Sequence, residues 1–396
     1  MAIKCICAEE FCTGCGTCIQ VCPKHAIKMQ ENQEGFLYPV IDNNCIECGL
    51  CVKKCPVNSV PQKHSATFYM GWHKDREILL SSSSGGLFTA ISRYVFERHG
   101  VVFGAVKDGK GDIIHMAARS EEELAPLKLS KYYQSIIGDA YKIAKDYLVD
   151  GRMVLFTGTA CQIAGLKNYL GKEYKNLITI DVLCHGVASK RVVEAFIKSK
   201  EKQFKKKVTD YNFRVKEAER GWYNGGGTRM HLFFEDGTSI TEPGKYDTYF
   251  LGFNNNYFLR ESCYRCKFCG TDRVSDFTLA DYWKCNNPDL ISEEQKKLGV
   301  ALVLANTEKA KEVLSGIQDQ VIMYEIDGTD AISHNRALDK PQDRPEIRND
   351  FYTLLSNMDY DSIIYNQFKS RFRKRKIKIL LKHVIPSSLY TRCFKD

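Results

Sequence analysis

The pattern of hydrophobic and polar positions is clearest in the middle of the chain. Apolar side chains recur every three or four positions, which predicts amphipathic helices, at residues 87–99, 135–150, 163–170 and 190–203. Apolar runs of strand length occur at residues 67–73, 101–106, 113–118, 153–156 and 177–183. Strands and helices therefore alternate here, and this order is typical of an α/β domain with a partly parallel sheet.

Two turns of this segment follow a strand and precede a helix, at residues 157–162 and 184–186. Because both turns have this connection, we expect them at the same carboxyl edge of the sheet. Ligands bind at that edge in open α/β sheets. Each turn carries one cysteine there, Cys161 in the first and Cys184 in the second.

A serine- and glycine-rich stretch, residues 81–86, lies directly before the helix predicted at 87–99. Free backbone amides and the helix dipole favour an anion at such a position. Two interpretations stay open for this stretch: a phosphate or flavin site, or an ordinary cap with a flexible loop.

The pattern on either side of the middle segment is shorter. A short helix is predicted at 121–127 and a longer one at 307–317, with strands at residues 34–42, 208–215, 230–234, 238–241, 300–305 and 321–326. The last forty residues are rich in lysine and arginine and resemble a basic amphipathic helix. This tail is either a solvated terminal helix or a segment that docks on an acidic partner or an anionic membrane surface.

Composition adds two constraints to this picture. The chain has 396 residues, a formal net charge of +9 and 17 cysteines, and no apolar run approaches a membrane span. The start of the chain has no apolar signal core, so we expect a cytoplasmic protein whose thiols bind metal and do not form disulfides. The excess positive charge is weak support for nucleic-acid binding, because no nucleic-acid motif accompanies it.

One cysteine pattern occurs twice near the start of the chain, each time with a proline after the fourth cysteine. The two copies are Cys12, Cys15, Cys18 and Cys22, then Cys45, Cys48, Cys51 and Cys55. This spacing predicts two 4Fe–4S clusters, in which the fourth cysteine of each copy binds the other cluster. Cluster I would take Cys12, Cys15, Cys18 and Cys55, and cluster II would take Cys45, Cys48, Cys51 and Cys22.

Two zinc sites or disulfides are the competing interpretations of this double pattern. Zinc knuckles lack the run of four cysteines with its trailing proline, so we favour the clusters. Gly16 and Gly49 supply permissive backbone where the loops wrap over the clusters. Cys5 and Cys7 precede the pattern and are interpreted as structural thiols.

We therefore predict three parts. Residues 1–63 form an α+β ferredoxin module with two clusters, residues 64–335 form a larger α/β domain, and residues 336–396 form a helical basic tail.

Four segments of the larger part carry a specific resemblance. SSSSGGLFTA (81–90), LFTGTACQIAGL (155–166), VLCHGVASKR (182–191) and SCYRCKFCGTDRVSDFTLADYW (262–283) resemble the coenzyme F-420 hydrogenase/dehydrogenase beta-subunit family. The resemblance runs from about residue 66 to about residue 330. It implies an α/β domain that holds FAD near a 4Fe–4S cluster and moves electrons between ferredoxin-type carriers and an organic compound.

Residue by residue, the resemblance implies two sites. The flavin site would include Ser83, Ser84, Gly85, Gly86, Thr157, Gly158 and Thr159. A third 4Fe–4S cluster would be held by Cys161, Cys184, Cys263 and Cys266.

The residues themselves agree on one point, since two cysteines on neighbouring sheet-edge turns and a CxxC pair make four convergent thiolates. Ala160 stands where the family has proline, and Cys269 is an additional thiol that could exchange with a ligand. A zinc site at Cys263, Cys266 and Cys269 is the alternative. His185 is the candidate proton donor, and a structural histidine is its alternative.

The sequence thus predicts a cytoplasmic iron–sulfur flavoprotein oxidoreductase. Electrons would pass between a reduced ferredoxin or partner subunit, three clusters, FAD and a small organic substrate, in either direction. The substrate choices are a deazaflavin, a quinone-like or tetrapyrrole-like compound, or a glycan-pathway intermediate. An electron-transfer subunit without its own substrate site is the alternative function; a homo-oligomer is left open.

Overall fold

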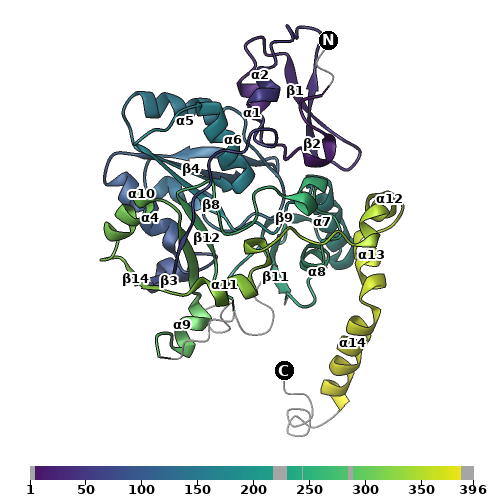
Figure 1. Ribbon diagram of the computed structural model, residues 1–396. Helices are drawn as coiled ribbons and strands as arrows, with labels where there is room; N and C mark the ends of the chain where they lie inside the picture. The colour runs from purple at the N-terminus through teal and green to yellow at the C-terminus, as the bar shows by residue number, and fades with distance from the viewer. Residues whose placement is uncertain (1–4, 217–229, 243, 284–288, 385–396) are drawn as a thin grey trace.

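The computed structural model describes residues 5–216, 230–242, 244–283 and 289–384. Figure 1 shows a small module at the N-terminus, a larger α/β region in the middle and a helical segment that leads away from the body at the C-terminus. The predicted mixed α/β architecture, with a large and partly parallel sheet, is confirmed.

Nine strands form the central sheet. In spatial order they are β14 (Val321–Glu325), β3 (Thr67–His73), β13 (Ala301–Ala305), β12 (Phe277–Asp281), β8 (Leu177–Val182), β7 (Val154–Thr159), β4 (Val101–Lys107), β5 (Ile113–Ala118) and β6 (Ser135–Ile136). The neighbours β12, β8, β7 and β4 run parallel to one another. The β12–β13, β13–β3, β3–β14 and β4–β5 pairs are antiparallel.

The register of the parallel strands brings the two predicted cysteine turns to one edge. Thr159 at the end of β7 lies beside Val182 at the end of β8, and Leu279 of β12 lies beside Val182 on its other side. The segments that follow β7 and β8 therefore begin next to each other, which is the placement expected for parallel strands.

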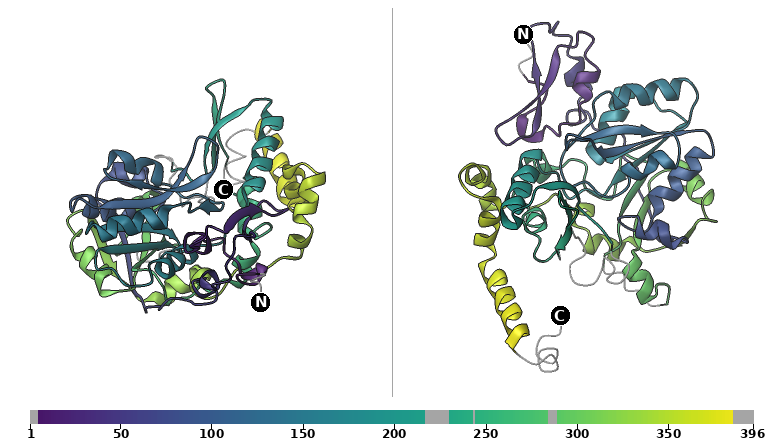
Figure 2. Two further views of the ribbon diagram at one scale, coloured as in Figure 1. Left: turned by 90° about the horizontal axis from the view of Figure 1, so that it is seen from above. Right: turned by 180° about the vertical axis from the view of Figure 1, so that it is seen from behind.

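Helices cover both faces of the sheet, as the alternation along β7 requires. Leu155 packs in a cluster with α4 (Leu87–Phe96) and α10 (Glu308–Ser315). Its neighbours Val154 and Phe156 point to the other face, against α5 (Ala140–Val149) and α6 (Ala160–Leu170). The α6 face is the one nearest the N-terminal module, as both views of Figure 2 show.

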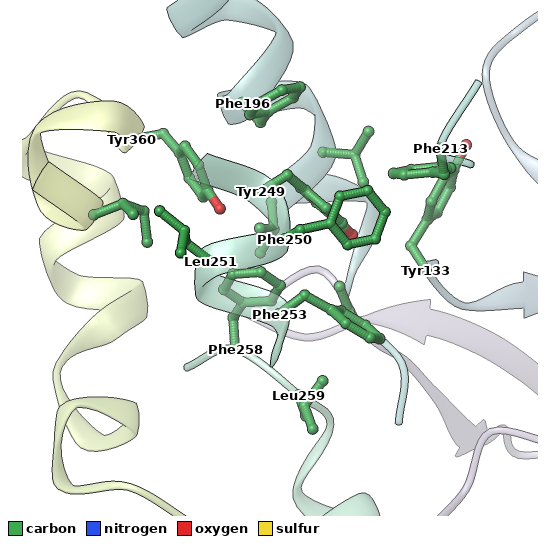
Figure 3. Packing of buried hydrophobic residues seen from close by; sticks show 14 of the residues in the cluster. Tyr133, Phe196, Phe213, Tyr249, Phe250, Leu251, Phe253, Phe258, Leu259 and Tyr360 are labelled. Atoms are coloured by element: carbon green, nitrogen blue, oxygen red, sulfur yellow. The ribbon is translucent and has the colours of Figure 1, made fainter. Parts of the chain in front are cut away.

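An aromatic cluster forms a second core beside the sheet. It joins α7 (Lys190–Phe204), α8 (Thr248–Asn254) and α13 (Tyr360–Gln367) to a three-stranded sheet. The strands of that sheet are β11 (Ser239–Glu242), β10 (Met230–Phe234) and β9 (Val208–Asn212). Figure 3 shows Tyr249 and Phe253 of α8 at its centre, with Phe258 and Tyr360 packed around them. Because rings fill this region, it serves as a rigid support for the segment that follows α8.

The remaining elements are short. They are α3 (Arg76–Leu80), α9 (Glu293–Leu298), α11 (Gly328–His334), α12 (Phe351–Asn357), and the 3-10 turns η1 (Glu9–Phe11), η2 (Glu122–Leu127), η3 (Glu261–Arg265), η4 (Arg336–Leu338) and η5 (Glu346–Asn349).

Three sequence-based element predictions were wrong in detail. The single helix predicted at 135–150 is strand β6 followed by α5, because Gly138 with φ +52° separates them. The single strand predicted at 34–42 is one arm of a hairpin, β1 (Ile27–Glu31) and β2 (Leu37–Ile41). Helix α6 begins at Ala160, so Cys161 lies in its first turn and not in a loop.

The N-terminal module contains the β1–β2 hairpin and two one-turn helices, α1 (Thr17–Gln20) and α2 (Leu50–Lys53). Gly16 and Gly49 precede these helices with φ of 76° and 70°. Only glycine adopts this left-handed backbone without strain, so both glycines fit the tight loops expected of them.

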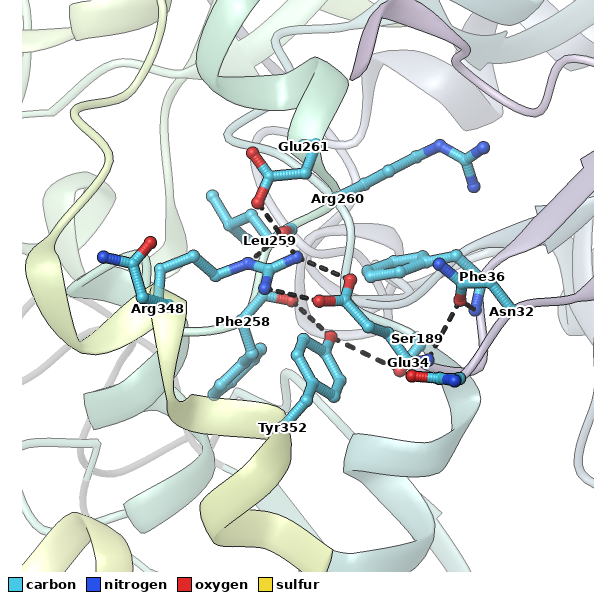
Figure 4. Close-up of polar contacts among 12 residues, drawn as sticks. Asn32, Glu34, Phe36, Ser189, Phe258, Leu259, Arg260, Glu261, Arg348 and Tyr352 are labelled. Atoms are coloured by element: carbon cyan, nitrogen blue, oxygen red, sulfur yellow. Dashed lines mark hydrogen bonds and ion pairs between the residues drawn. The ribbon is translucent and has the colours of Figure 1, made fainter. Parts of the chain in front are cut away.

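The module is docked on the rest of the chain by buried ionic contacts (Figure 4). The carboxylate of Glu34 accepts two hydrogen bonds of 2.7 Å from Arg348, whose side chain is 2% exposed. Arg348 also donates to the Leu259 carbonyl and lies 3.4 Å from Glu261. A buried bidentate pair of this kind fixes the orientation of the two parts more strongly than a surface pair does.

Helix α14 (Lys369–Val384) leads away from the body, and Figure 1 shows it projecting from α13. Residues 385–396 of the predicted basic tail lie outside the described residues. Across the part of the chain that the structure describes, no helix is both long enough and apolar enough to cross a bilayer.

Candidate iron–sulfur and flavin sites

The structure gathers the eight cysteines of the double pattern around two cavities in the N-terminal module. One cavity is lined by Cys12, Cys15, Cys18 and Cys55, together with Cys7. The other is lined by Cys22, Cys45, Cys48 and Cys51. Each cavity thus combines three cysteines of one copy with the fourth cysteine of the other. Their empty volumes are nearly equal, about 330 and 320 Å³, as expected for two copies of one prosthetic group.

Backbone amides already point at several of these sulfurs. The amide of Ala26 donates to Cys22 Sγ and the amide of Glu47 donates to Cys45 Sγ, both at 3.4 Å. Such N–H···S contacts stabilise thiolates and tune cluster potentials. The donor set therefore fits iron–sulfur clusters in these two cavities.

Cys7 lies closer to cluster I than the sequence indicated. Its thiol donates to Cys12 and lowers the pKa of that thiol to about 6, and it lowers the pKa of Cys55 to about 7 in the same way. Cys7 is therefore a fifth sulfur at the first cavity. Its position before the pattern gave no signal of this contact.

A third cysteine group is buried where the module meets the sheet edge. Cys161 comes from the first turn of α6, Cys184 from the segment after β8, and Cys263 and Cys266 from η3 and its end. Gly186, with φ +146°, lets the Cys184 segment approach η3, since a Cβ there would lie 3.3 Å from Cys263 Cβ. The chain thus brings together four thiols that are far apart in sequence.

The electrostatics of these four thiols follow from their proximity. Burial, together with the charges of the neighbouring Cys266 and Cys263, raises the pKa of Cys161 to about 12. Burial also raises the pKa of Cys184 well above its ordinary value, with Cys263, Cys161 and Cys266 contributing. Four buried thiolates that repel one another need a strongly positive core between them, and iron ions supply one.

Cys269 lies beside this group. Its thiol hydrogen-bonds to the Cys266 side chain, which lowers the pKa of Cys266 to about 7, and donates to the Cys266 carbonyl at 3.2 Å. Within the described residues, no three His, Cys, Asp or Glu side chains surround a single metal-ion position. Ligands of a cubane stand further apart than ligands of one ion, because the cluster fills the space between them.

The predicted flavin residues form two separate groups. Ser83 Oγ accepts hydrogen bonds from the amide and hydroxyl of Ser130, at 2.9 and 3.1 Å. Ser84 Oγ donates to the Val300 carbonyl at 3.2 Å. Gly85 is packed tightly, since a Cβ there would lie 2.5 Å from the Gly71 carbonyl oxygen. Gly86, with φ +81°, is the N-cap of α4.

The second group, Thr157, Gly158 and Thr159, ends β7. Thr157 Oγ1 donates to the Phe103 carbonyl at 2.8 Å, and Thr159 forms a capping box with Gln162 at the start of α6. Thr159 Oγ1 also lies 3.1 Å from Cys161 Sγ, so this group is in contact with the third cysteine group.

Two buried lysines near the serines were missed by the sequence analysis. Lys216 Nζ donates to the Ser84 carbonyl at 2.5 Å and to the Leu79 carbonyl, and burial lowers its pKa to about 7. Lys131, next to Ser130, is held by the Pro126 and Lys128 carbonyls, and burial lowers its pKa to about 7 as well. Lysines are common on surfaces, so no sequence pattern marked these two.

His185 is fixed by α8. Its Nε2 lies 3.2 Å from the Phe253 carbonyl oxygen and its ring packs on the Phe253 ring, with centroids 5.0 Å apart. Burial lowers the pKa of His185, so the neutral imidazole is favoured. A neutral ring that accepts or donates one hydrogen bond is compatible with either of its two interpretations.

Comparison with known proteins follows the same division of the chain. Residues 11–59 match the family described as 4Fe-4S dicluster domain. Residues 151–329 match the family described as the C terminus of the beta subunit of coenzyme F420 hydrogenase/dehydrogenase. The protein is thus an iron–sulfur protein of the oxidoreductase class. Residues 151–329 belong to that beta-subunit family, and residues 11–59 are its N-terminal dicluster domain.

Among solved structures, the chain is similar to one of the F420-reducing NiFe hydrogenase complex from Methanosarcina barkeri. The sequence identity is 17%, the match covers 70% of this chain and 90% of that chain, and the TM-score is 0.47. The comparison with curated proteins found no match.

Proposed function

We propose that the protein is an iron–sulfur flavoprotein oxidoreductase that exchanges electrons between a ferredoxin-type partner and an organic substrate. The observation that carries the proposal is the convergence of Cys161, Cys184, Cys263 and Cys266 beside the cavity of cluster I. A ferredoxin module that merely stored electrons would need no such group. The four thiols would hold a third 4Fe–4S cluster, and Cys269 would stay a hydrogen-bond donor to Cys266.

The three cysteine groups differ in exposure, which suggests a direction through the chain. The cluster I cysteines are all buried, whereas Cys48 and its neighbour Ile46 (56% exposed) lie at the surface. A partner carrying electrons would dock at the cluster II end, because transfer needs close approach. The buried third group would then be the terminus nearest the substrate.

FAD is the cofactor proposed for the substrate step. The clusters exchange single electrons, and the flavin supplies the two-electron exchange with an organic substrate. The amides at the start of α4 with Lys216 and Lys131 nearby form a cationic region that suits its pyrophosphate. Thr157–Thr159 would contact the flavin next to the third cluster, and His185 would serve as its proton donor.

Metal and flavin analysis tests this function. Anaerobically purified protein should contain about twelve irons per chain and one FAD. A content of about eight irons would remove the third cluster. Twelve irons without flavin would reduce the protein to an electron-transfer subunit that serves a partner. With flavin present, acceptors including a deazaflavin, a quinone and a tetrapyrrole should then be screened for substrate.

The partner could also be reached through α14. The described part of this helix has basic residues and no acidic residue, and Lys369, Arg371, Arg373 and Lys374 are exposed. We propose that it binds an anionic surface, either an acidic partner or a membrane. Deleting residues 369–396 should abolish sedimentation with phosphatidylserine vesicles and leave flavin content unchanged. Retained sedimentation would exclude the membrane and leave the acidic partner to be sought.

A further inference from the structure

One arginine lies fully buried where the N-terminal module meets the third cysteine group. Arg260 is 0% exposed and comes three residues before Cys263, just after the segment supported by the aromatic core. Its Nε donates to the Cys12 carbonyl at 2.6 Å, and its Nη2 donates to the Leu37 carbonyl at 3.0 Å. The side chain therefore reaches out of the α/β region and holds both the cluster I loop and the β2 strand.

The partners of this guanidinium are neutral. Besides the two carbonyls, Nη1 donates to the amide oxygen of Gln134 at 3.2 Å, and the Tyr38 ring lies 4.0 Å from Cζ. Other buried arginines here have carboxylates: Arg348 pairs with Glu34 and Arg273 pairs with Asp181. A buried cation with only neutral contacts is costly unless a nearby negative charge compensates it.

The position of Arg260 shows where that negative charge would be. Its charge acts on two cysteines that belong to different groups, since it lowers the pKa of Cys12 and opposes the increase in the pKa of Cys263 caused by burial. A 4Fe–4S core with four thiolates carries about −2 overall. The guanidinium therefore lies between two groups that would each become anionic when loaded.

The same interface brings the two cysteine groups close together. Gly165 of α6 faces α1, and a Cβ there would lie 2.6 Å from Thr17 Oγ1 and 3.3 Å from Cys15 Cβ. Tyr141 Oη bridges them by donating to the Cys15 and Gln162 carbonyls, at 3.1 and 2.8 Å. Burial raises the pKa of Cys161, and the Cys15 charge contributes to that increase.

We infer that Arg260 is the shared counter-charge of cluster I and the third cluster, and that it sets the potentials at which electrons cross between them. This inference rests on the third cluster of the proposed function. Reduction adds an electron to a cluster that is already negative, so a fixed cation nearby stabilises the reduced form. Arg260 would therefore raise the reduction potential of both clusters together. Cluster II, on the far side of the module, would be little affected.

Two variants separate the charge of Arg260 from its hydrogen bonds. Arg260→Gln removes the charge and keeps an amide donor, whereas Arg260→Lys keeps the charge and loses the planar fork. The measurement is an anaerobic redox titration of the whole protein followed by electron paramagnetic resonance. In Arg260→Gln, the midpoint potentials of cluster I and the third cluster should both fall, with cluster II unchanged. In Arg260→Lys, both should stay close to wild type.

A double variant controls for loosened docking. Glu34→Gln with Arg348→Gln removes the other buried link between module and body without changing the net charge, and it should leave all three potentials unchanged. The inference is overturned if Arg260→Gln shifts no potential, shifts all three equally, or shifts only what the double variant shifts. Iron content separates this failure from the other: about eight irons in wild type refutes the third cluster itself.

Assembly gives a second readout if Arg260→Gln cannot be loaded. Loss of iron from this variant, with full iron in Arg260→Lys, supports the counter-charge role, because the charge is then needed to hold two anionic clusters. Equal loss in both variants contradicts it and assigns Arg260 to packing alone.

Discussion

The N-terminal module and the third cysteine group contain the same chemical parts, arranged by different means. In the module, three thiols of each cavity come from one short run, and a single hairpin and two glycines are enough to close them together. The third group needs two strand ends, a helix start and η3, and these meet only after the sheet has formed. Local spacing thus specifies the first kind of site, whereas topology specifies the second.

The largest effect should come from crossing the two copies of the cysteine pattern. Cys55→Ser should remove cluster I and keep cluster II, although Cys55 belongs to the second copy, because it lines the first cavity. Iron should fall from about twelve to about eight per chain. Cys22→Ser is the matched variant and should remove cluster II instead, since Cys22 lines the other cavity. Spectra in which each variant loses the cluster of its own copy would rule out the crossed arrangement.

The next effect concerns the third group and its spare thiol. Cys184→Ser should remove one cluster's signal, about four irons, and leave the module pair intact. Cys269→Ser is the control, because Cys269 only hydrogen-bonds to Cys266 and should keep all the iron. An undiminished spectrum in Cys184→Ser together with iron loss in Cys269→Ser would mean that Cys269 is a ligand and Cys184 is not.

The comparison also explains how far the sequence could be interpreted. The central sheet was predictable because its strands are short apolar runs and the β7–β8 pair has helices after both strands. The split of residues 135–150 into β6 and α5 was missed because a glycine break inside an amphipathic pattern looks like a weak helix position. The start of α6 was missed because the Thr159–Gln162 capping box lies inside what looked like a turn.

Residues that act across the interface were beyond sequence reasoning. Glu34 and Arg348 are more than three hundred positions apart, and Arg260 meets Cys12 and Leu37 only in the folded chain. Single buried charges have no periodic signature, so only the three-dimensional arrangement identifies them. Burial of Lys216 and Lys131 belongs to the same class.

A smaller effect should come from breaking the buried ion pair that joins module and body. Arg348→Met leaves Glu34 without its bidentate partner, and breaking a buried pair costs about 3–5 kcal/mol; partial exposure of Glu34 favours the lower end. The control is Arg76→Met, because its pair with Glu294 is exposed and should contribute about 0–1 kcal/mol. Urea unfolding with cluster absorbance as probe measures both. Equal midpoints in the two variants would contradict the docking role of Arg348.

The smallest effect is a pH dependence confined to the α/β region. His115 of β5 is buried, with Nε2 3.1 Å from the Thr157 carbonyl oxygen and its ring stacked on Phe156, and burial lowers its pKa from 6.5 to about 4. Between these two pH values the unfolded chain binds more protons at this position than the folded chain does. The stabilisation is therefore present at neutral pH and is lost as the pH falls below 6.5.

From pH 7 to pH 5.5 the expected loss is about 1 kcal/mol, and His115→Phe should abolish this part of the pH dependence while keeping the stack on Phe156. Tryptophan fluorescence during urea unfolding is a suitable probe, because the three tryptophans, Trp72, Trp222 and Trp283, all lie outside residues 1–63. The N-terminal module should instead follow its clusters, whose loss on acidification is seen by absorbance. If the fluorescence transition of His115→Phe moves with pH as much as the wild-type transition does, other groups control the stability of the α/β region, and His115 serves only to orient the Thr157 carbonyl.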